Sequence, residues 1–191
     1  MTEFIPFNDL KKNYMSIKSE IDKSIQNVID NGYFILGPEV ESFESNFSSY
    51  LNVKYCAGVS SGTSAIELAL KALNIGHDDE VITTAHTWVS TAEAISNVNA
   101  KPVFVDIDES SFNINPSLIE DKITKKTKAI LPVHLYGNPA DMKKILKIAK
   151  KHNLRVIEDS AQALGSYYPD GRHMGTAGIA GSISFSMPKI I

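Results

Sequence analysis

Polar and aromatic residues follow several of the short apolar segments of this chain. They occupy residues 60–64, 85–88, 134–137, 158–162 and 186–189. In open parallel α/β sheets, ligands bind beyond the carboxyl ends of the strands. If the apolar segments are the strands of such a sheet, these five groups meet at one edge, and we expect a binding site there.

Two of these groups carry side chains that ionise. Asp159 ends an apolar strand, where a carboxylate is costly to bury unless a positive group pairs with it. It is expected to cap a loop, hold a metal or face a cationic ring nitrogen, and Glu158 should point to the opposite side of the strand. No His-rich spacing supports a metal centre, so the ring nitrogen is favoured. Lys189 is either a solvated surface charge or an amine nucleophile at a strand end.

Residues 60–64, with the sequence SSGTS, lead from a strand into a helix. Backbone N–H groups at a helix start attract a phosphate, and the alternative is an ordinary helix cap with a glycine in a tight turn. The fingerprint G-x-G-x-x-G and the P-loop G-x-x-x-x-G-K are absent here, which argues against a Rossmann dehydrogenase or a nucleotide hydrolase. Trp88, the only tryptophan, either packs in the core or stacks on a flat ring at the site mouth.

Alternating strand and helix patterns predict the fold. We expect strands at residues 55–59, 81–84, 102–107, 129–133, 155–157 and 182–187. We expect helices at residues 9–32, 38–51, 63–73, 88–97, 116–123 and 140–151. Continuously apolar strands that alternate with helices are typical of α/β proteins, in which a mostly parallel sheet is sandwiched by helices.

Composition narrows the function classes. The 191 residues carry a formal charge of −3, whereas nucleic-acid binding favours clustered excess Lys and Arg. The single cysteine, Cys56, excludes an internal disulfide and a Cys-based metal cage, and its apolar neighbours predict a buried structural thiol. The first residues lack a signal-peptide pattern, and no apolar run approaches the roughly 20 residues of a membrane span. We therefore expect a soluble, cytoplasmic protein that binds neither nucleic acid nor membranes.

Five motifs occur in order along the chain. They are GPEVxxFE from Gly37, SGTSA from Ser61, PVHLYG from Pro132, EDSAQA from Glu158 and SFxxxK from Ser184. Together they resemble the DegT/DnrJ/EryC1/StrS family of sugar aminotransferases, of the aspartate aminotransferase superfamily (fold type I). The resemblance implies an N-terminal helical segment at residues 1–36. It also implies a large domain that binds pyridoxal phosphate at residues 37–191, incomplete at its C-terminal end and lacking the small C-terminal domain.

The resemblance also implies roles for the residues around the cofactor ring. Lys189 would form the Schiff base with pyridoxal phosphate and later carry a proton between the substrate carbon and the cofactor. Asp159 would pair with the pyridine nitrogen and keep it protonated. Gln162 would contact the 3-hydroxyl oxygen, and Trp88 would stack on the ring face.

Further residues are assigned by the same resemblance. Gly62 and Thr63 would bind the phosphate through the backbone and a hydroxyl, and Ser184 would add a second hydroxyl. His134 and Tyr136 would lie on the substrate side of the pocket. No metal is implied.

The implied function is transfer of an amino group from glutamate or glutamine to a nucleotide-linked keto-sugar, in amino-sugar or polysaccharide biosynthesis. Family members are roughly twice as long and form homodimers, so the chain is predicted to be truncated and to have little or no activity alone. One alternative is an inactive remnant that binds partner subunits or ligand. Another is the related sugar dehydratase, which Lys189 disfavours because a histidine replaces the lysine in those enzymes.

Overall fold

The computed structural model describes residues 6, 9–186 and 189. The chain divides into two units, Met1–Gly58 and Val59–Ile191, and each is described by itself. The sequence places the start of the large domain at residue 37, and that boundary stays a prediction.

The first unit consists of helices. They are α1 (Leu10–Ser16), α2 (Lys18–Asn31) and α3 (Pro38–Leu51). The helix predicted over residues 9–32 is therefore two helices, because Ile17 leaves the helical conformation at φ −123°. Asp9 caps α1 by accepting the Lys12 N–H at 2.9 Å, and α2 ends at Gly32, whose φ of +69° suits glycine.

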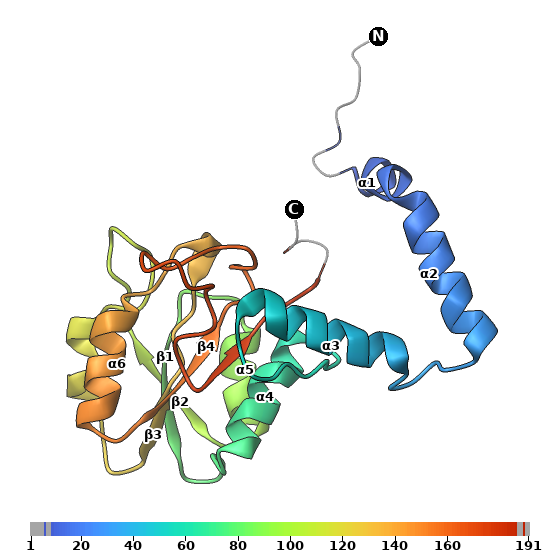
Figure 1. Cartoon of the computed structure of the whole chain (residues 1–191). Coiled ribbons are helices and arrows are strands. Elements are labelled where there is room, and N and C mark those ends of the chain that lie inside the picture. Colours follow the sequence, from blue (N-terminus) through green and yellow to red (C-terminus); the bar gives the residue numbers. More distant parts are fainter. Residues whose placement is uncertain (1–5, 7–8, 187–188, 190–191) are drawn as a thin grey trace. The chain divides into compact units, whose positions relative to one another are not determined.

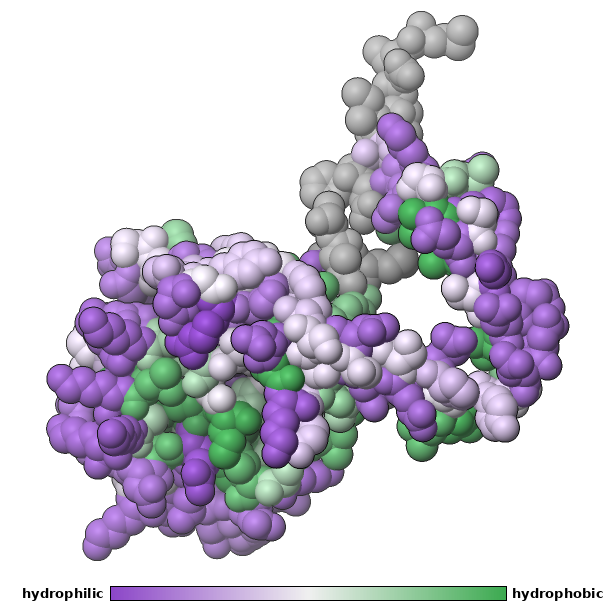
Figure 2. Space-filling view, in the orientation of Figure 1, coloured by the Kyte–Doolittle hydropathy of each residue, from purple (hydrophilic) through white to green (hydrophobic). Residues whose placement is uncertain are grey.

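Apolar side chains lie at the surface of this helical unit. α1 and α2 bury no residue, and a row at four-residue spacing along α2 and its start, Ile17, Ile21, Ile25 and Ile29, is exposed. Figure 2 shows hydrophobic atoms among the hydrophilic ones in this part of the molecule. The apolar residues at helical spacing thus form a stripe along the helix, and this stripe is exposed in the structure.

The second unit is a five-stranded parallel sheet with helices. Its helices are α4 (Gly62–Ala72), α5 (Ser90–Asn97) and α6 (Met142–Lys151). Its strands are β1 (Glu80–Thr84), β2 (Lys101–Val105), β3 (Thr127–Ile130), β4 (Arg155–Asp159) and β5 (Ala180–Ser182). The strand order is β2-β1-β3-β4-β5, and every pairing is parallel, which confirms the predicted α/β class.

Helices cover both faces of this sheet. In Figure 1, α6 lies on one side and α4 and α5 lie on the other. Neighbouring residues of one strand point to opposite sides, so Ile82 joins the core beneath α6 and Val81 joins the core beneath α4 and α5. Burial on both faces explains the apolar residues of β1, which is buried along its whole length, whereas β2 at the sheet edge buries only Val105.

Besides the first helix, three further predicted elements differ from the structure. Residues 55–59 form no strand, and none of them pairs with another strand among the described residues. The helix predicted at residues 116–123 is two 3₁₀ turns, Pro116–Leu118 and Glu120–Lys122. The last strand is shorter than predicted and ends at Ser182, while residue 187 lies outside the described residues.

The structure also bears on the predictions for Cys56 and for membrane-spanning helices. Cys56 is half-buried rather than buried, and this burial raises the pKa of its thiol. In the described part of the chain, no helix is both long and apolar enough to cross a bilayer.

Candidate active site

A pocket of about 210 Å³ lies at the carboxyl edge of the sheet in the second unit. It is lined by Ser61, Gly62, Thr63, Ile66, Thr87, Trp88, Ser90, Thr91, Val133, Asp159, Ala161, Gln162, Ser184, Ser186 and Lys189. All seven residues that the sequence predicted to hold a cofactor are among them. Parallel strands explain this convergence, because segments that follow β1, β4 and β5 leave the sheet at the same edge.

The start of α4 forms one wall of the pocket. Ser61 caps the helix, and its Oγ accepts the Ser64 N–H at 3.1 Å. The N–H groups of Gly62 and Thr63 belong to the first helical turn, where no preceding carbonyl is available to them. With the helix dipole behind them, these two groups suit an anion such as a phosphate.

Ser182, which ends β5, and Ser184, which follows it, lie close to the same helix start. Ser182 Oγ donates to the Gly62 carbonyl at 3.0 Å, which ties β5 to α4. A Cβ added to Gly62 would lie 3.4 Å from the Cβ of Ser184. Ser184 therefore stands against the helix start, as expected for a second hydroxyl beside a bound phosphate.

Asp159 presents a carboxylate to the pocket from the end of β4. It is 6% exposed, and it accepts hydrogen bonds from Thr91 Oγ1 at 2.8 Å and from the Ala161 N–H at 3.1 Å. An ionised carboxylate has about four acceptor positions, so these two donors leave room for a donor in the pocket. A protonated ring nitrogen fits this requirement.

Helix α5 and the residues just before it supply two further side chains, of which the sequence identified one. Trp88 precedes the helix, is 66% exposed and lines the pocket. Thr91 follows three residues later and is fully buried against Asp159. Thr87 Oγ1 lies 3.0 Å from Thr91 Oγ1, so the hydroxyls at i and i+4 form a short chain that ends at the carboxylate. That spacing was the available sequence signal for Thr91.

Gln162 is oriented by a backbone contact. Its Oε1 accepts the Tyr136 N–H at 2.9 Å. This contact uses the amide oxygen, so the NH₂ group is the part of the side chain that can donate toward the pocket.

Lys189 lines the pocket from the turn after β5. The Lys189 N–H donates to the Ser186 carbonyl at 2.8 Å, and the Ser186 N–H donates to Ser184 Oγ at 3.3 Å. These two bonds form the turn that carries the lysine. An amine and the Asp159 carboxylate thus line the same pocket.

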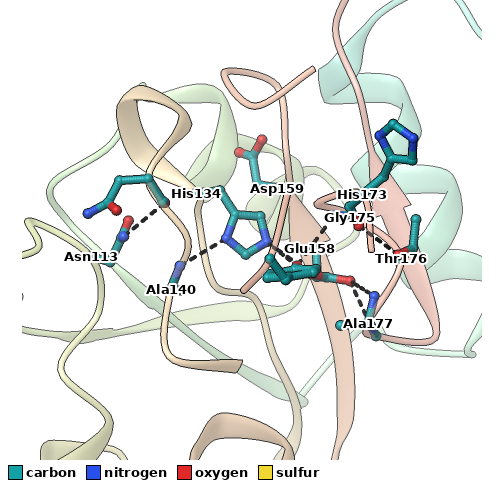
Figure 3. Close-up of polar contacts among 12 residues, drawn as sticks. Asn113, His134, Ala140, Glu158, Asp159, His173, Gly175, Thr176 and Ala177 are labelled. Atoms are coloured by element: carbon teal, nitrogen blue, oxygen red, sulfur yellow. Dashed lines mark hydrogen bonds and ion pairs between the residues drawn. The ribbon is translucent and has the colours of Figure 1, made fainter. Parts of the chain in front are cut away.

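The structure places His134 and Tyr136 outside the pocket lining. His134 is fully buried, and its Nε2 lies 2.9 Å from Glu158 Oε2. Figure 3 shows its ring between Ala140 and Glu158, away from the Asp159 carboxylate. The expected contact between His134 and a substrate therefore does not fit, because the ring is enclosed by protein. Tyr136 is 74% exposed and stands outside the pocket.

Metal chemistry has no ligand set in the described residues. No three His, Cys, Asp or Glu side chains come together there in an arrangement that would hold an ion. Of the three roles open to Asp159, pairing with a cationic ring nitrogen agrees best with an amine and a helix start in the same pocket.

The chain is similar to known aminotransferases. The sequence profile of the DegT/DnrJ/EryC1/StrS aminotransferase family matches residues 15–191. A dTDP-3-amino-3,6-dideoxy-alpha-D-galactopyranose transaminase of Aneurinibacillus thermoaerophilus is 47% identical over 181 residues, covering 95% of this chain and 50% of the relative. A UDP-2-acetamido-2-deoxy-3-oxo-D-glucuronate aminotransferase of Pseudomonas aeruginosa is 44% identical over 92% of this chain and 49% of the relative.

A solved structure agrees with these relatives. The crystal structure of S. venezuelae DesV in complex with a ketimine intermediate matches with a TM-score of 0.89 and 44% identity, over 95% of this chain and 48% of that chain. The chain thus spans about half the length of the relatives that it matches.

Proposed function

Because the chain belongs to the DegT/DnrJ/EryC1/StrS aminotransferase family, we propose that its pocket binds pyridoxal phosphate and serves amino transfer to a nucleotide-linked keto-sugar. Glutamate or glutamine is the proposed amino donor. Two relatives, named as a transaminase of a dTDP-linked amino sugar and an aminotransferase of a UDP-linked oxo-sugar acid, support this substrate class. A cytoplasmic homodimer, with amino-sugar or polysaccharide biosynthesis as its context, belongs to the same proposal.

One observation carries the proposal. A helix start suited to a phosphate, a carboxylate with free acceptor capacity and a lysine amine line one pocket of about 210 Å³. The helix start suits the phosphate of pyridoxal phosphate, the carboxylate suits its ring nitrogen, and the lysine amine suits its aldehyde.

The residues present fit this cofactor. When bound, pyridoxal phosphate supplies an electrophilic carbonyl carbon and a ring that accepts electrons. The N–H groups of Gly62 and Thr63 would hold the phosphate, and Asp159 would hold a proton on the ring nitrogen. Lys189 would attack the carbonyl as a neutral amine and afterwards move a proton at the reacting carbon. Trp88 would cover one ring face and limit access of water.

An aromatic rim beside the pocket suits the sugar nucleotide. The His86 ring lies 6.1 Å from the Phe112 ring and 6.5 Å from the Tyr136 ring. Phe112 and Tyr136 have φ values of +58° and +55°, a strained conformation for bulky residues. Tyr136 is tied to the pocket through Gln162, so we assign this rim to the substrate, with Tyr136 as a contact.

One alternative is an inactive remnant that binds cofactor or a partner without catalysing amino transfer. The dehydratase alternative is disfavoured because those enzymes have a histidine at the position where this chain has Lys189, which lines the pocket.

The test uses the purified chain and pyridoxal phosphate. A visible absorption band that borohydride removes, with the reduced cofactor found on Lys189 by peptide mass spectrometry, is expected. Lys189→Ala should abolish this adduct, whereas Lys147→Ala, an exposed lysine of α6, should leave it unchanged. An adduct that persists in Lys189→Ala contradicts the proposal.

A second measurement separates the enzyme from the remnant. The loaded chain is mixed with glutamate and a keto-sugar linked to dTDP or UDP, and amino-sugar product is followed by mass spectrometry. Product that depends on Lys189 supports the aminotransferase. A cofactor adduct without product supports the remnant.

A further inference from the structure

A buried polar network lies behind the pocket, on the opposite side of β4 from the Asp159 side chain. We define the Glu158 network as Glu158 with the side chains of His134 and Tyr168 and the N–H groups of Ala177 and Gly178 that bond to it. Glu158 and His134 are fully buried, and Tyr168 is 6% exposed. None of these residues lines the pocket, and the proposed function gives them no role.

Four donors surround the Glu158 carboxylate. The N–H groups of Ala177 and Gly178 donate to Oε1 at 2.7 and 2.6 Å. Tyr168 donates its hydroxyl proton to Oε2, and His134 Nε2 lies 2.9 Å from the same oxygen. A buried carboxylate with this number of donors is stable in its ionised form.

The tautomer of His134 follows from its second nitrogen. The Ala140 N–H donates to Nδ1 at 3.1 Å, so Nδ1 carries a lone pair and the ring proton is on Nε2. His134 is therefore a neutral donor to Glu158, and Figure 3 shows the contacts of its two ring nitrogens. The network consequently holds one net negative charge.

The surroundings of Glu158 do not cancel this charge. Tyr168 and Arg172 come from the segment after β4, and Arg172 lies 5.7 Å above the Tyr168 ring while pairing with Asp170. The residues of β5 beside Glu158 carry no ionisable side chain, and the α6 lysines at 143, 144, 147, 150 and 151 are exposed. Burial would raise the pKa of Glu158, but hydrogen bonds from His134 and Tyr168 outweigh it and hold that pKa below its usual value.

Glu158 and Asp159 are mechanically coupled. They are consecutive in β4, and Figure 3 shows their side chains pointing in different directions. The backbone N–H of His134 donates to the Asp159 carbonyl at 3.0 Å, and the backbone N–H of Asp159 donates to the Pro132 carbonyl at 2.9 Å. The network therefore holds the strand end from which Asp159 enters the pocket.

We propose that Glu158 is a positioning residue of the cofactor site, which orients Asp159 and places a second, buried negative charge behind it that favours the protonated cofactor. The proposal rests on the proposed function, because it requires a cofactor that carries a proton in the pocket. The charged groups that line the pocket itself are Asp159 and Lys189. Glu158 acts through the strand and through its field, and it touches neither cofactor nor substrate.

The test is the pH dependence of the visible absorption band of chain loaded with pyridoxal phosphate. Glu158→Gln removes the charge and keeps the shape. It should lower the pH midpoint of the spectral change by about one unit, because a lost anion disfavours the protonated form. Tyr168→Phe removes the hydroxyl, which donates to Glu158, lies 2.9 Å from His134 Nε2 and accepts the Gly175 N–H, but it keeps the charge. Its midpoint should therefore stay within about 0.3 units of the parent.

Cofactor affinity tests the orienting role separately. Tyr168→Phe should weaken pyridoxal phosphate binding about three- to tenfold, because Asp159 is held less firmly. Ile145→Val, in α6 and buried in the same core as Tyr168, is the control for lost stability and should leave affinity unchanged. This comparison of affinities tests the orienting role even if the Glu158→Gln variant does not fold.

The outcomes separate the two proposals. A parent chain without any visible band overturns both the proposed function and this inference. If the pH midpoint is the same in Glu158→Gln and the parent, the proposed effect of the buried charge is overturned. If Tyr168→Phe and Ile145→Val bind pyridoxal phosphate equally well, the orienting role is overturned. If the midpoint shifts equally in Tyr168→Phe and Glu158→Gln, the shift comes from a change of structure and not from the lost charge, and the proposed effect of the charge is again overturned.

Discussion

Two carboxylates that are neighbours in β4 lie in regions of opposite character. Glu158 is fully buried and accepts from four donors, all supplied by the protein. Asp159 faces the pocket and has two protein donors, from Thr91 and Ala161. The hydrogen bonds of the Glu158 carboxylate all come from the protein, whereas the Asp159 carboxylate has acceptor capacity that is open to the pocket.

The difference in hydrogen bonding between Glu158 and Asp159 shows that the end of one strand contributes to both stability and binding. Strand residues alternate between faces, so a pair of consecutive carboxylates places one in the protein interior and the other at the site. Buried polar groups stabilise a fold only when every partner is present, whereas incomplete hydrogen bonding is typical of a binding site. We expect substitutions on the two sides to separate stability from cofactor affinity.

The largest expected effect is on stability. Glu158→Ala removes the acceptor that the His134 and Tyr168 donors and two backbone N–H groups share in the interior, so the free energy of unfolding should fall by about 3–5 kcal/mol. Asp159→Ala should lower it by less than about 1.5 kcal/mol, because water reaches the pocket. Urea denaturation followed by circular dichroism measures both. Equal losses in the two variants would remove the distinction between the regions.

The next effect is on cofactor affinity. Asp159→Asn keeps the shape of the side chain but removes the charge that pairs with a ring nitrogen, so pyridoxal phosphate should bind on the order of 100-fold more weakly. The free energy of unfolding should change by less than about 1 kcal/mol. Spectroscopic titration gives the affinity, and Asp170→Asn, an exposed aspartate paired with Arg172, is the control. An affinity that matches that of the control contradicts the assigned role.

A smaller effect is expected from acid. The pKa of Glu158 is lowered in the folded protein, so its ionisation contributes stability above the unfolded value of about 4.3. That contribution is lost as the pH falls from about 4.3 through the folded pKa. The gap in unfolding free energy between parent and Glu158→Gln should therefore narrow below pH ~4.3. A gap that stays constant between pH 7 and pH 3 would mean that Glu158 is not ionised in the native state.

Much of this comparison follows from the sequence. The alternation of side chains predicts that Glu158 and Asp159 diverge, and a parallel sheet predicts that segments after β1, β4 and β5 meet at one edge. The apolar pattern gives the sheet because strands buried on both faces need apolar residues on both sides.

Other features depend on long-range contacts that leave no local pattern. His134 stands two residues before Tyr136, yet its ring turns inward because Glu158 and Ala140 supply partners. Two of the donors to Glu158 are backbone N–H groups of Ala177 and Gly178, which any residue except proline could provide. Residues 55–59 have a strand-like composition but no strand partner among the described residues, and a strand without a neighbour has no ladder to join.

The smallest expected effect concerns the helix that supports Asp159. Thr91→Val keeps the size of the side chain and removes the hydroxyl that donates to Asp159 Oδ2, so pyridoxal phosphate affinity should fall about three- to tenfold, and the unfolding free energy by about 1 kcal/mol. Thr83→Val is the matched control, because Thr83 is also fully buried and its Oγ1 donates to the Leu131 carbonyl, away from the pocket lining. Thr83→Val should lose similar stability without weakening the cofactor, and Thr91→Ser should restore affinity. Equal affinities in Thr91→Val and Thr83→Val would show that Asp159 needs no support from α5, and the pocket side of β4 would then be as self-sufficient as the Glu158 network.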